Sequence, residues 1–359
     1  MADTIAGRYN ERFFEEFINI VKGAYAAFDG EAFLRLIYDE EWESRAFKAR
    51  MRHIANVLRQ TLQPSYREAL SILERIAPQC TGVEYLFFPD FVEAFGLEDW
   101  DASIAALEAF TPYSSSEFAV RPFILKYGEQ MINVMLQWAE HSDHHVRRLA
   151  SEGCRPRLPW AMALEQYKAD PTPLLPILEK LKRDEYLYVR KSVANHINDI
   201  AKDHPQLVIQ LARSWYGQHE HTDWIVRHGC RGLLRKGEAE ILTLFGFQLE
   251  PDVTIVDFIV EESRINIGQS LHFAFTISNN LGEGQRLRVE YGIDFVKANG
   301  KTSRKLFKIA DHDIEQRDKR YVRVHHFKDL TTRKHYPGVH AIAIVINGVE
   351  LAAKEFYVD

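Results

Sequence analysis

The sequence predicts a multidomain protein, with an all-α solenoid of paired helices over residues 1–247 and an all-β sandwich over residues 252–359. Three observations support this prediction. A short cassette recurs in the middle of the chain, apolar residues recur at three- and four-residue intervals up to about residue 246, and beyond residue 252 they alternate. A chain of 359 residues is also longer than one ordinary core supports, so two domains are expected.

The recurring cassette is an acidic residue followed by a Val-Arg pair, at the start of a helix of small and apolar residues. Its Val stands at positions 146, 189 and 226, and a fainter copy contains Val120. The spacings of 43 and 37 residues fall in the period range of HEAT-type repeats, in which each repeat is a pair of helices. Repeats of this kind stack into a curved solenoid with a concave groove.

Helices are expected almost without interruption before the sandwich. From Met1 to Val21, charges alternate with Phe and Ile, which indicates an amphipathic helix and not a signal peptide. Pro159, Pro173 and Pro205 are each placed at a first helical turn, which tolerates the missing N–H. The apolar spacing predicts helices over Arg8–Tyr25, Glu43–Leu62 and Ser65–Ile76, then the pairs Glu129–Glu140 with Asp143–Glu152, Pro173–Arg183 with Leu187–Asp203, and Pro205–Tyr216 with Asp223–Lys236.

Short apolar alternations and turn signals follow residue 252. About seven short strands in some hundred residues favour an immunoglobulin-like sandwich, although no Cys…Trp…Cys core signature is present. Asn347-Gly348 predicts a tight hairpin. Seven cations between Arg286 and Lys308 are interpreted as a solvated face. The clearest strands are expected over Val253–Ile259, Ser270–Ile277, Arg286–Ile293, Arg320–His326 and Val339–Ile346.

Composition and charge limit the possible functions. No stretch approaches the roughly 20 apolar residues of a membrane helix, and the three cysteines lie far apart, which suits a reducing cytoplasm. We expect a cytoplasmic protein, and we also expect a monomer. Residues 1–113 carry 11 Lys and Arg against 19 Asp and Glu, whereas residues 114–237 carry 18 against 14. The repeat segment is therefore the basic part of an acidic protein. An anionic partner is expected to bind there.

Glu152 and Asp199 are the first candidate catalytic residues. Glu152 lies six positions after its cassette Val, and Asp199 lies ten positions after its own. The two offsets differ by one helical turn, so both side chains should project from the same face of adjacent repeats. Asp199 also stands in a polar stretch of an otherwise apolar helix, where an acid needs a partner or a purpose. Aligned carboxylates suit cation recognition or hydrolysis.

Scaffold roles compete for the cassette residues. The acid before Val-Arg is expected to cap its helix, and the Arg to bond to the next repeat. Glu117 occupies the same position in its cassette as Asp143, so a helix cap is an open alternative for Glu117. The residues assigned to the scaffold by this argument are Asp143, Asp223, Arg147, Arg190 and Arg227.

One aromatic residue and five cations are candidates for lining the groove and holding phosphates. Trp160 follows Pro159, so we expect it at a helix start that lines the groove, with a core aromatic as the alternative. Cations together with backbone N–H groups at helix starts can hold phosphates, although each cation alone is more simply a surface charge. The cations are Arg148, Arg155, Arg157, Lys191 and Arg231.

Cofactor and metal motifs find little support. The spacing of His219 and His221 suits a metal ion, but the pair lies in a polar loop without a Cys or a further nearby acid. Neither a P-loop nor a dinucleotide fingerprint occurs. We expect no cofactor and no metal.

Three segments resemble the AlkC family of bacterial DNA alkylation-repair glycosylases, which belongs to the HEAT-like-repeat superfamily shared with AlkD. They are Ser115–Phe123, Arg147–Trp160 and Val189–Ile200, of which the middle one is long and specific. The likeness covers essentially the whole chain, because AlkC proteins carry an immunoglobulin-like domain after the repeats.

The resemblance implies base excision repair of alkylation damage. The family hydrolyses the N-glycosidic bond of cationic methylated bases in double-stranded DNA, chiefly 3-methyladenine but also 3-methylcytosine and 1-methyladenine, without flipping the lesion. It implies that Glu117, Glu152 and Asp199 face the lesion and that Trp160 packs beside it. Cations of the concave edge would hold the backbone, and the sandwich would close over the DNA.

The residues agree with this chemistry. A cationic base needs no protonation to leave, so ionised carboxylates suffice to stabilise the sugar cation and to orient a water. No Lys lies beside these acids in the sequence motifs, so we expect a monofunctional hydrolase without Schiff-base chemistry. The alternative is a non-catalytic HEAT-repeat scaffold that binds DNA or protein through its groove.

Overall fold

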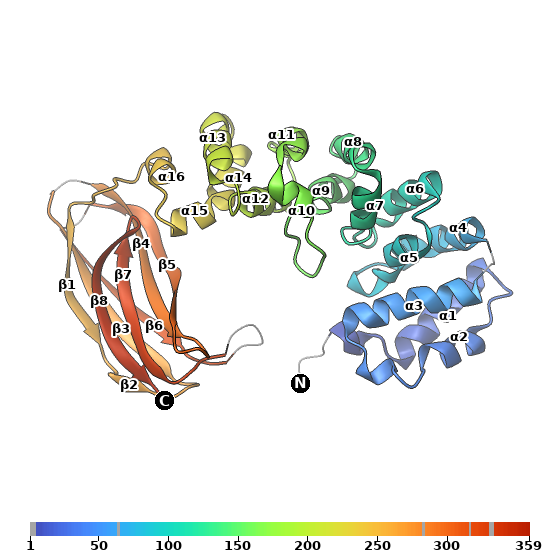
Figure 1. Ribbon diagram of the computed structural model, residues 1–359, viewed down its shortest axis with the longest axis horizontal. Helices are drawn as coiled ribbons and strands as arrows, with labels where there is room; N and C mark the ends of the chain where they lie inside the picture. Colours follow the sequence, from blue (N-terminus) through green and yellow to red (C-terminus); the bar gives the residue numbers. More distant parts are fainter. Residues whose placement is uncertain (1–4, 63–64, 282–283, 316, 330–333) are drawn as a thin grey trace. The chain divides into compact units, whose positions relative to one another are not determined.

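The computed structural model describes residues 5–62, 65–281, 284–315, 317–329 and 334–359. They form two compact units, Met1–His204 with Trp215–Gly229 and Pro205–Ser214 with Cys230–Asp359. Helices follow one another up to Leu244, and strands follow from Val253 (Figure 1), which confirms the predicted fold class. The domain limits at residues 247 and 252 stay a prediction. None of the helices described is both long and apolar enough to cross a lipid bilayer.

The first unit is built from helices joined by short loops. Asn10, Asp29 and Ser65 each cap a helix by accepting a backbone N–H, which explains why these helices begin where they do. The helices are α1 (Glu11–Ala24), α2 (Gly30–Ile37), α3 (Phe47–Thr61), α4 (Tyr66–Ile76), α5 (Phe87–Phe95), α6 (Trp100–Phe110), α7 (Val120–Tyr127), α8 (Glu129–Trp138), α9 (His144–Glu152), α10 (Glu165–Ala169), α11 (Leu175–Leu181), α12 (Leu187–Ile200) and α14 (Glu220–Gly229).

Most predicted helices lie where expected. The helix predicted at the N-terminus is α1, preceded by a 3-10 turn at Ile5–Arg8, and residues 1–4 lie outside the described residues. The single helix predicted over Asp223–Lys236 is wrong, because α14 ends at Gly229 and a separate helix starts at Arg231. A helix start at Pro159 is also wrong, since Pro159 lies in a loop and the next helix begins at Glu165.

The cassette valines build the core of the repeats. Val120, Val146, Val189 and Val226 are all at most 1% exposed. Their helices stack in one layer, in which α9 packs on α12 and α12 packs on α14, while α8 and α11 form a second layer (Figure 1). A Cβ at Gly229 would come within 2.9 Å of Ile197, so this glycine permits the close approach of α14 to α12. The predicted paired-helix repeats are confirmed.

The polar cassette residues follow the scaffold prediction only in part. Asp143 caps α9, and Arg147 reaches the next repeat through Asp184, with 2.6 Å between its Nε and Oδ2. Arg190 instead donates to the carbonyls of Asp184 and Glu185 just before its own helix. Asp223 is not a cap, because α14 already begins at Glu220, and Asp223 accepts the N–H of Gly217.

The second unit contains the sandwich. Its short helices are α15 (Arg231–Arg235) and α16 (Ala239–Leu244), and most of α13 (Pro205–Trp215) also belongs to it. One sheet has the order β1-β3-β6 and the other β2-β8-β7-β4-β5, with all neighbours antiparallel except β2 and β8. The strands are β1 (Val253–Val260), β2 (Arg264–Ile265), β3 (Ser270–Asn279), β4 (Gln285–Val296), β5 (Thr302–Ile314), β6 (Asp318–His326), β7 (Gly338–Ile346) and β8 (Val349–Val358).

The five predicted strands are present, and the sequence missed β2, β5 and β8. Strand β5 lies at the edge of its sheet and is half-exposed along most of its length, so it lacks a clean apolar alternation. The predicted hairpin at Asn347-Gly348 joins β7 to β8, with positive φ angles of 48° and 85° at the two residues. Asn347 also fixes the turn by accepting the N–H of Arg288 at 2.7 Å.

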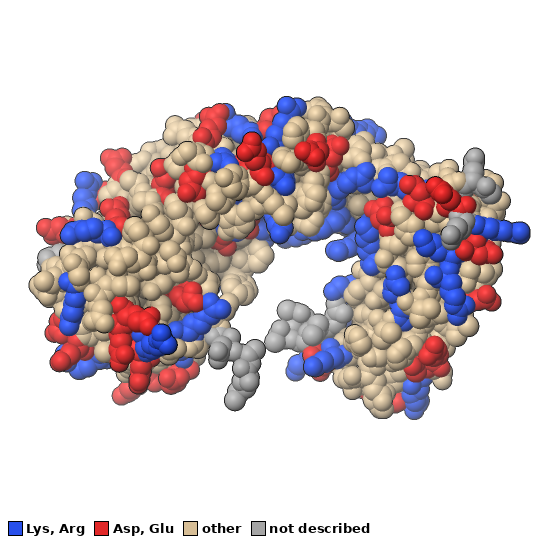
Figure 2. Space-filling view, turned by 180° about the vertical axis from the view of Figure 1, so that it is seen from behind, with Lys and Arg blue, Asp and Glu red and all other residues tan. Residues whose placement is uncertain are grey.

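The cations of β4 and β5 are largely neutralised inside the sandwich itself. Arg288 is buried and pairs with Glu290 at 2.6 Å, so it does not belong to the solvated face that the sequence predicted. Arg304 pairs with Asp294 at 2.7 Å on the surface. Figure 2 shows Lys and Arg interspersed with Asp and Glu over this part of the protein. Four of the seven cations therefore have a carboxylate partner, namely Arg286, Arg288, Arg304 and Lys308.

Candidate active site

Two buried carboxylates from neighbouring repeats meet on one arginine. Arg155, in the loop after α9, donates from Nη1 to Oε1 of Glu152 at 2.6 Å and from Nε to Oδ2 of Asp199 at 2.9 Å. Glu152 lies at the end of α9 and is 6% exposed, and Asp199 lies near the end of α12 and is 2% exposed. The predicted convergence of the two carboxylates is confirmed. Their roles are not decided by this geometry.

Glu117 belongs to the same row of charged side chains, at the end opposite Asp199. It lies in the loop before α7, and its Oε2 accepts from Oγ of Ser115 at 2.9 Å and from Nη1 of Arg148. Arg148, on α9, has its Nη2 3.4 Å from Oε1 of Glu152. The row therefore alternates in sign, from Glu117 through Arg148, Glu152 and Arg155 to Asp199. Because α7 starts at Val120 and has no side-chain cap, the helix-cap alternative for Glu117 is wrong.

The three carboxylates differ in which oxygens remain available. Asp199 uses both, Oδ2 with Arg155 and Oδ1 with Lys202 at 3.0 Å, so the expectation that no Lys lies beside these acids is wrong. Glu152 uses Oε1 for both arginines, and Glu117 uses Oε2 for Ser115 and Arg148. Oε2 of Glu152 and Oε1 of Glu117 make no hydrogen bond to any residue that the structure describes. These two oxygens can therefore accept from a bound water or contact a positive charge.

Burial makes the charges of the row mutually dependent. Loss of hydration by itself would lower the pKa of Arg148, but the carboxylates of Glu117 and Glu152 raise it above its usual value. Removing one member of a buried ion pair leaves the other charge uncompensated, which typically destabilises a protein by about 3–5 kcal/mol. The row is thus a single electrostatic unit, because each carboxylate in it bonds to an arginine and each arginine contacts two carboxylates.

Arg121, the arginine of the fainter cassette copy, fixes the loop that follows α9. It is 1% exposed and has no carboxylate partner among the described residues. Its Nη1 donates to the carbonyls of Gly153 and Arg155, both at 2.9 Å, and its Nε to that of Met162, also at 2.9 Å. Burial, followed by the neighbouring Arg155, lowers the pKa of Arg121 to about 10. The loop that positions Arg155 is thus attached to a buried cation.

Trp160 lies in this same loop. Its side chain is 67% exposed, so the core-aromatic alternative is wrong. It has a φ of 63°, a left-handed conformation that is uncommon outside glycine, and its carbonyl accepts from Nζ of Lys48 at 2.8 Å. The loop holds a large aromatic ring in solvent at some conformational cost, which points to a binding role.

The five predicted DNA-binding cations lie in different environments. Arg155 is buried and Arg148 is partly buried within the carboxylate row, and both pair with carboxylates, so neither lies on an exposed phosphate-binding edge. Arg157 pairs with Asp203 at 2.7 Å and is partly exposed, and Lys191 lies exposed on α12. Arg231 is the first residue of α15 and belongs to the second unit.

His196 connects α12 to α9 beside the row. Its Nδ1 lies 3.0 Å from the carbonyl of Ser151, and since a carbonyl only accepts, Nδ1 must carry the proton. Nε2 has no hydrogen-bond partner among the residues described. Burial, and then the charge of Arg155, lower the pKa of His196 to about 3. His196 therefore has a structural role, which explains part of the polar stretch on α12.

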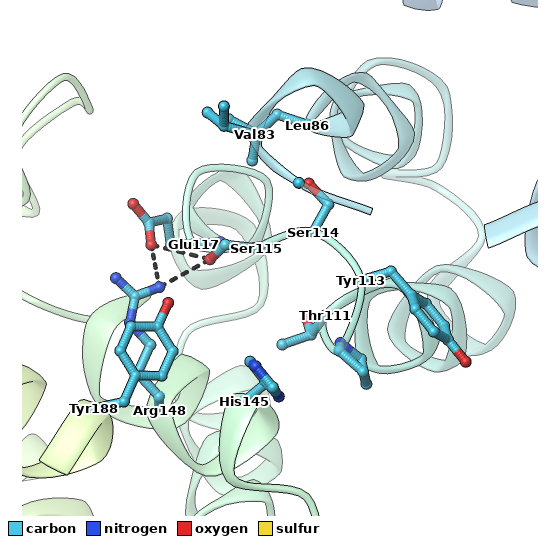
Figure 3. Close-up of a pocket in the computed structure, with 12 residues that line it drawn as sticks. Val83, Leu86, Thr111, Tyr113, Ser114, Ser115, Glu117, His145, Arg148 and Tyr188 are labelled. Carbon is cyan, nitrogen blue, oxygen red and sulfur yellow. Dashed lines mark hydrogen bonds and ion pairs between the residues drawn. The ribbon is translucent and has the colours of Figure 1, made fainter. Parts of the chain in front are cut away.

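A cavity of about 370 Å³ adjoins the Glu117 end of the row (Figure 3). Glu117 and Arg148 belong to its wall. Tyr188, at the start of α12, lies beside Arg148, with 4.9 Å from the guanidinium carbon to the ring centre. This cavity was not predicted from the sequence, and only the shared Ser115-Ser-Glu117 motif pointed near it. Its lining residues are Gly82, Val83, Leu86, Thr111, Pro112, Tyr113, Ser114, Ser115, Glu117, His145, Arg148 and Tyr188.

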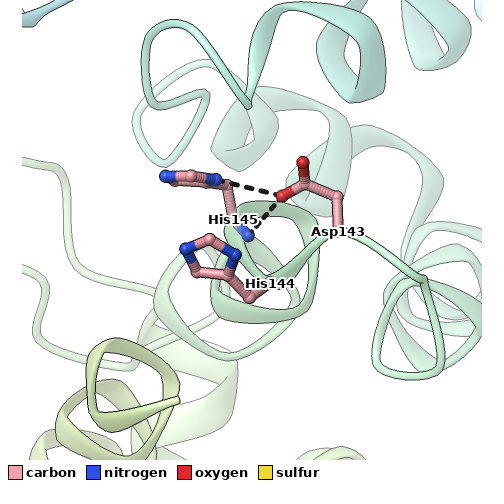
Figure 4. Close-up of side chains that lie close together, drawn as sticks. All are labelled: Asp143, His144 and His145. Carbon is pink, nitrogen blue, oxygen red and sulfur yellow. Dashed lines mark hydrogen bonds and ion pairs between the residues drawn. The ribbon is translucent and has the colours of Figure 1, made fainter.

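Two clusters of possible metal ligands lie among the described residues, one at the start of α9 and one in the second unit, the latter consisting of Glu261, Glu262 and His272. Asp143, His144 and His145 bring ligand atoms within 4.8 Å of one another at the start of α9 (Figure 4). Oδ1 of Asp143 already accepts from the backbone and the ring of His145, so the cap occupies the carboxylate. The rings of His219 and His221 lie 5.0 Å apart, and this pair is not part of either three-residue ligand cluster among the described residues.

Comparisons with family models, with a curated relative and with a solved structure point to the same group of proteins. The family described as "DNA alkylation repair enzyme" matches residues 111–233, and that described as "Uncharacterised protein YhaZ, C-terminal Ig-like domain" matches residues 254–359. The Bacillus subtilis protein YhaZ is 48% identical over 98% of both chains. The structure of Pseudomonas fluorescens alkylpurine DNA glycosylase AlkC, bound to DNA containing an abasic-site analogue, is 37% identical over 99% of both chains, with a TM-score of 0.95.

Proposed function

The chain belongs to the AlkC family of DNA alkylation-repair enzymes, and we propose that it is a monofunctional DNA glycosylase. Its substrates would be cationic alkylated bases in double-stranded DNA, chiefly 3-methyladenine, with 3-methylcytosine and 1-methyladenine as further candidates. It would act as a monomer, without metal and without flipping the base. The observation behind the proposal is the row of Glu117, Glu152 and Asp199, joined by Arg148 and Arg155, in which Glu152 and Asp199 are buried.

The row suits a substrate that already carries its positive charge. When the glycosidic bond breaks, its electron pair stays on the base nitrogen and neutralises the base, so no acid is needed. Positive charge then develops on the sugar, where an ionised carboxylate lowers the energy of the transition state. Water adds to C1′ and gives its proton to a carboxylate. A neutral base would bring no such charge to this site, which provides selectivity.

The available oxygens suggest different roles for the three acids. Glu152 and Glu117 would face the reacting atoms, because each keeps one oxygen without a described partner. Asp199 would act through Arg155, since Arg155 and Lys202 occupy both of its oxygens. Arg148 and Arg155 would position these acids and not hold the DNA backbone, which revises the prediction from the sequence.

DNA contact would then fall to more exposed residues. Trp160 offers an exposed ring on a fixed loop, and Lys191 and Arg157 lie outside the buried row. We retain Arg231 as a phosphate-binding candidate on α15. Binding through such cations should weaken as the salt concentration rises, because counterions are released from the phosphates.

Excision from methylated DNA tests the proposal. The purified protein should release 3-methyladenine faster than spontaneous loss from the same DNA. Glu152→Gln should slow release roughly a hundredfold to a thousandfold while DNA binding persists, because the amide keeps the shape but lacks the charge. Lys180→Met removes an exposed cation of α11 that pairs with Glu140, and serves as the control. DNA binding without any release would favour the non-catalytic scaffold.

A further inference from the structure

We propose that the cavity beside Glu117 receives the methylated purine base after its glycosidic bond has broken. This inference rests on the proposed function and extends it to the fate of the product. The cavity and the carboxylate row share Glu117 and Arg148, so a base released over the row has the cavity directly beside it. The volume of about 370 Å³ lies at the small end of the range for small-molecule sites, roughly 300–1,000 Å³.

The shape and lining of the cavity suit a planar aromatic ring. Figure 3 shows Tyr188 and His145 on the side of Arg148, with Val83 and Leu86 across from them. The ring centroids of Tyr188 and His145 lie 5.9 Å apart with the ring planes at 66°, so the two rings meet edge to face on this side of the cavity. Aromatic side chains can stack on any nucleobase, because every base has a π face. Apolar contacts opposite the rings would complete the site.

Polar groups in the wall match the edge of a purine. Glu117 keeps Oε1 without a hydrogen bond to a described residue, and it can accept from the exocyclic amino group of adenine derivatives. Ser114 is 6% exposed, and its Oγ has no described hydrogen-bond partner. A ring nitrogen of a base can accept from such a hydroxyl. These two groups would fix the orientation of the ring.

The charge of the wall fits the product better than the substrate. Bond cleavage leaves the electron pair on the base, which turns the cationic base into a neutral one. Arg148 already neutralises Glu117, and Ser115 donates to the same oxygen. A neutral ring can enter this paired wall without burying an unpaired charge. A phosphate fits less well, because it would compete with Glu117 for Arg148 and face the carboxylate.

Binding of free bases to the full-length protein tests the inference. Calorimetric titration with free 3-methyladenine should give saturable binding. Tyr188→Ala should weaken it at least tenfold by removing the stacking ring, and Val83→Trp should do the same by filling the cavity. Tyr186→Ala is the matched control, because this neighbouring ring stacks on His144 and does not line the cavity. It should bind within twofold of the parent.

Several outcomes would overturn the inference. They are an absence of saturable binding up to millimolar concentrations, equal weakening by Tyr186→Ala and Tyr188→Ala, or inorganic phosphate binding with the same variant pattern. Single-turnover excision measured on the same samples separates the two proposals. Excision without base binding would contradict the product site and support the glycosylase. Base binding without excision would contradict the glycosylase and support a site for the base.

Discussion

At the scale of single residues, Arg155 determines how two repeats cooperate. It is buried between Glu152 and Asp199 and bonds to both, so the position of one carboxylate depends on the other. Each oxygen of Asp199 bonds to a cation, whereas Oε2 of Glu152 has no hydrogen-bond partner among the described residues. Burial is essential to this coupling, because exposed pairs of the same kind contribute little.

A double-mutant cycle tests the indirect role of Asp199. Asp199→Asn and Arg155→Lys should each slow excision at least about tenfold, since both misplace Glu152. The double variant should be no slower than the worse single variant, because both changes break one connection. Single-turnover rates on methylated DNA measure this. If the two losses instead multiply, Asp199 acts on the substrate independently of Arg155.

Substitution of Trp160 should affect DNA binding but not the stability of the fold. Because its side chain is mostly exposed, Trp160→Ala should leave stability within about 0.5 kcal/mol of the parent. Affinity for DNA should fall, since an exposed ring on a fixed loop is suited to contact a nucleotide. Thermal unfolding and DNA titration measure the two effects. A large loss of stability with unchanged affinity would make Trp160 a structural residue of the loop.

At the level of helices and loops, the arginine of the cassette has different partners in different repeats. In the second repeat, Arg147 bonds across to Asp184 and thereby joins α9 to the next repeat. In the fainter copy, Arg121 instead bonds to carbonyls of the loop at 153–162. The loop has no strand or helix of its own at these bonds, so Arg121 supplies the donors that its buried carbonyls need.

Arg121→Met therefore tests whether the loop must be fixed for activity. The variant keeps the apolar stem but leaves three carbonyls without their donor, which should lower stability by about 2–4 kcal/mol. Arg147→Met should destabilise comparably by leaving Asp184 unpaired. Only Arg121→Met should also slow excision more than tenfold, measured well below both melting temperatures. Equal loss of excision in the two variants would reduce Arg121 to a stability role.

At the scale of the whole molecule, each unit contains a buried neutral histidine. Burial lowers the pKa of His196 in the first unit to about 3, and it also lowers the pKa of His340 in the second unit. Unfolding exposes both rings, which then bind protons below their usual pKa near 6.5. The unfolded chain takes up more protons than the folded one, so acid should destabilise both units.

The pH dependence of stability follows with a definite sign. The contribution of neutral His196 is complete above pH 6.5 and should fall by up to about 1.4 kcal/mol per pH unit between pH 6.5 and 3. His196→Asn keeps a donor for the carbonyl of Ser151 but does not titrate, so its stability should fall less steeply. Denaturant unfolding from pH 7.5 to 5 compares the slopes. Parallel slopes would show that His196 is not responsible.

Local sequence patterns were sufficient to predict the two-part architecture, the period of the repeats and the convergence of Glu152 and Asp199. These features depend on local periodicity, because helical spacing fixes which face a side chain occupies. The buried valines of the cassette and the Asn347-Gly348 hairpin were predictable for the same reason. Strand β5 was not, since an edge strand needs no regular apolar alternation.

The assembly of the site depends on contacts between segments that lie far apart in the sequence. Arg155 looked like a phosphate-binding cation in the sequence, but the fold buries it between acids 3 and 44 residues away. The cavity draws its lining from residues between Gly82 and Tyr188, and Arg121 reaches a loop 32 to 41 residues further along. No local pattern encodes such partners. Burial and ion pairing depend on which segments the folded chain brings together.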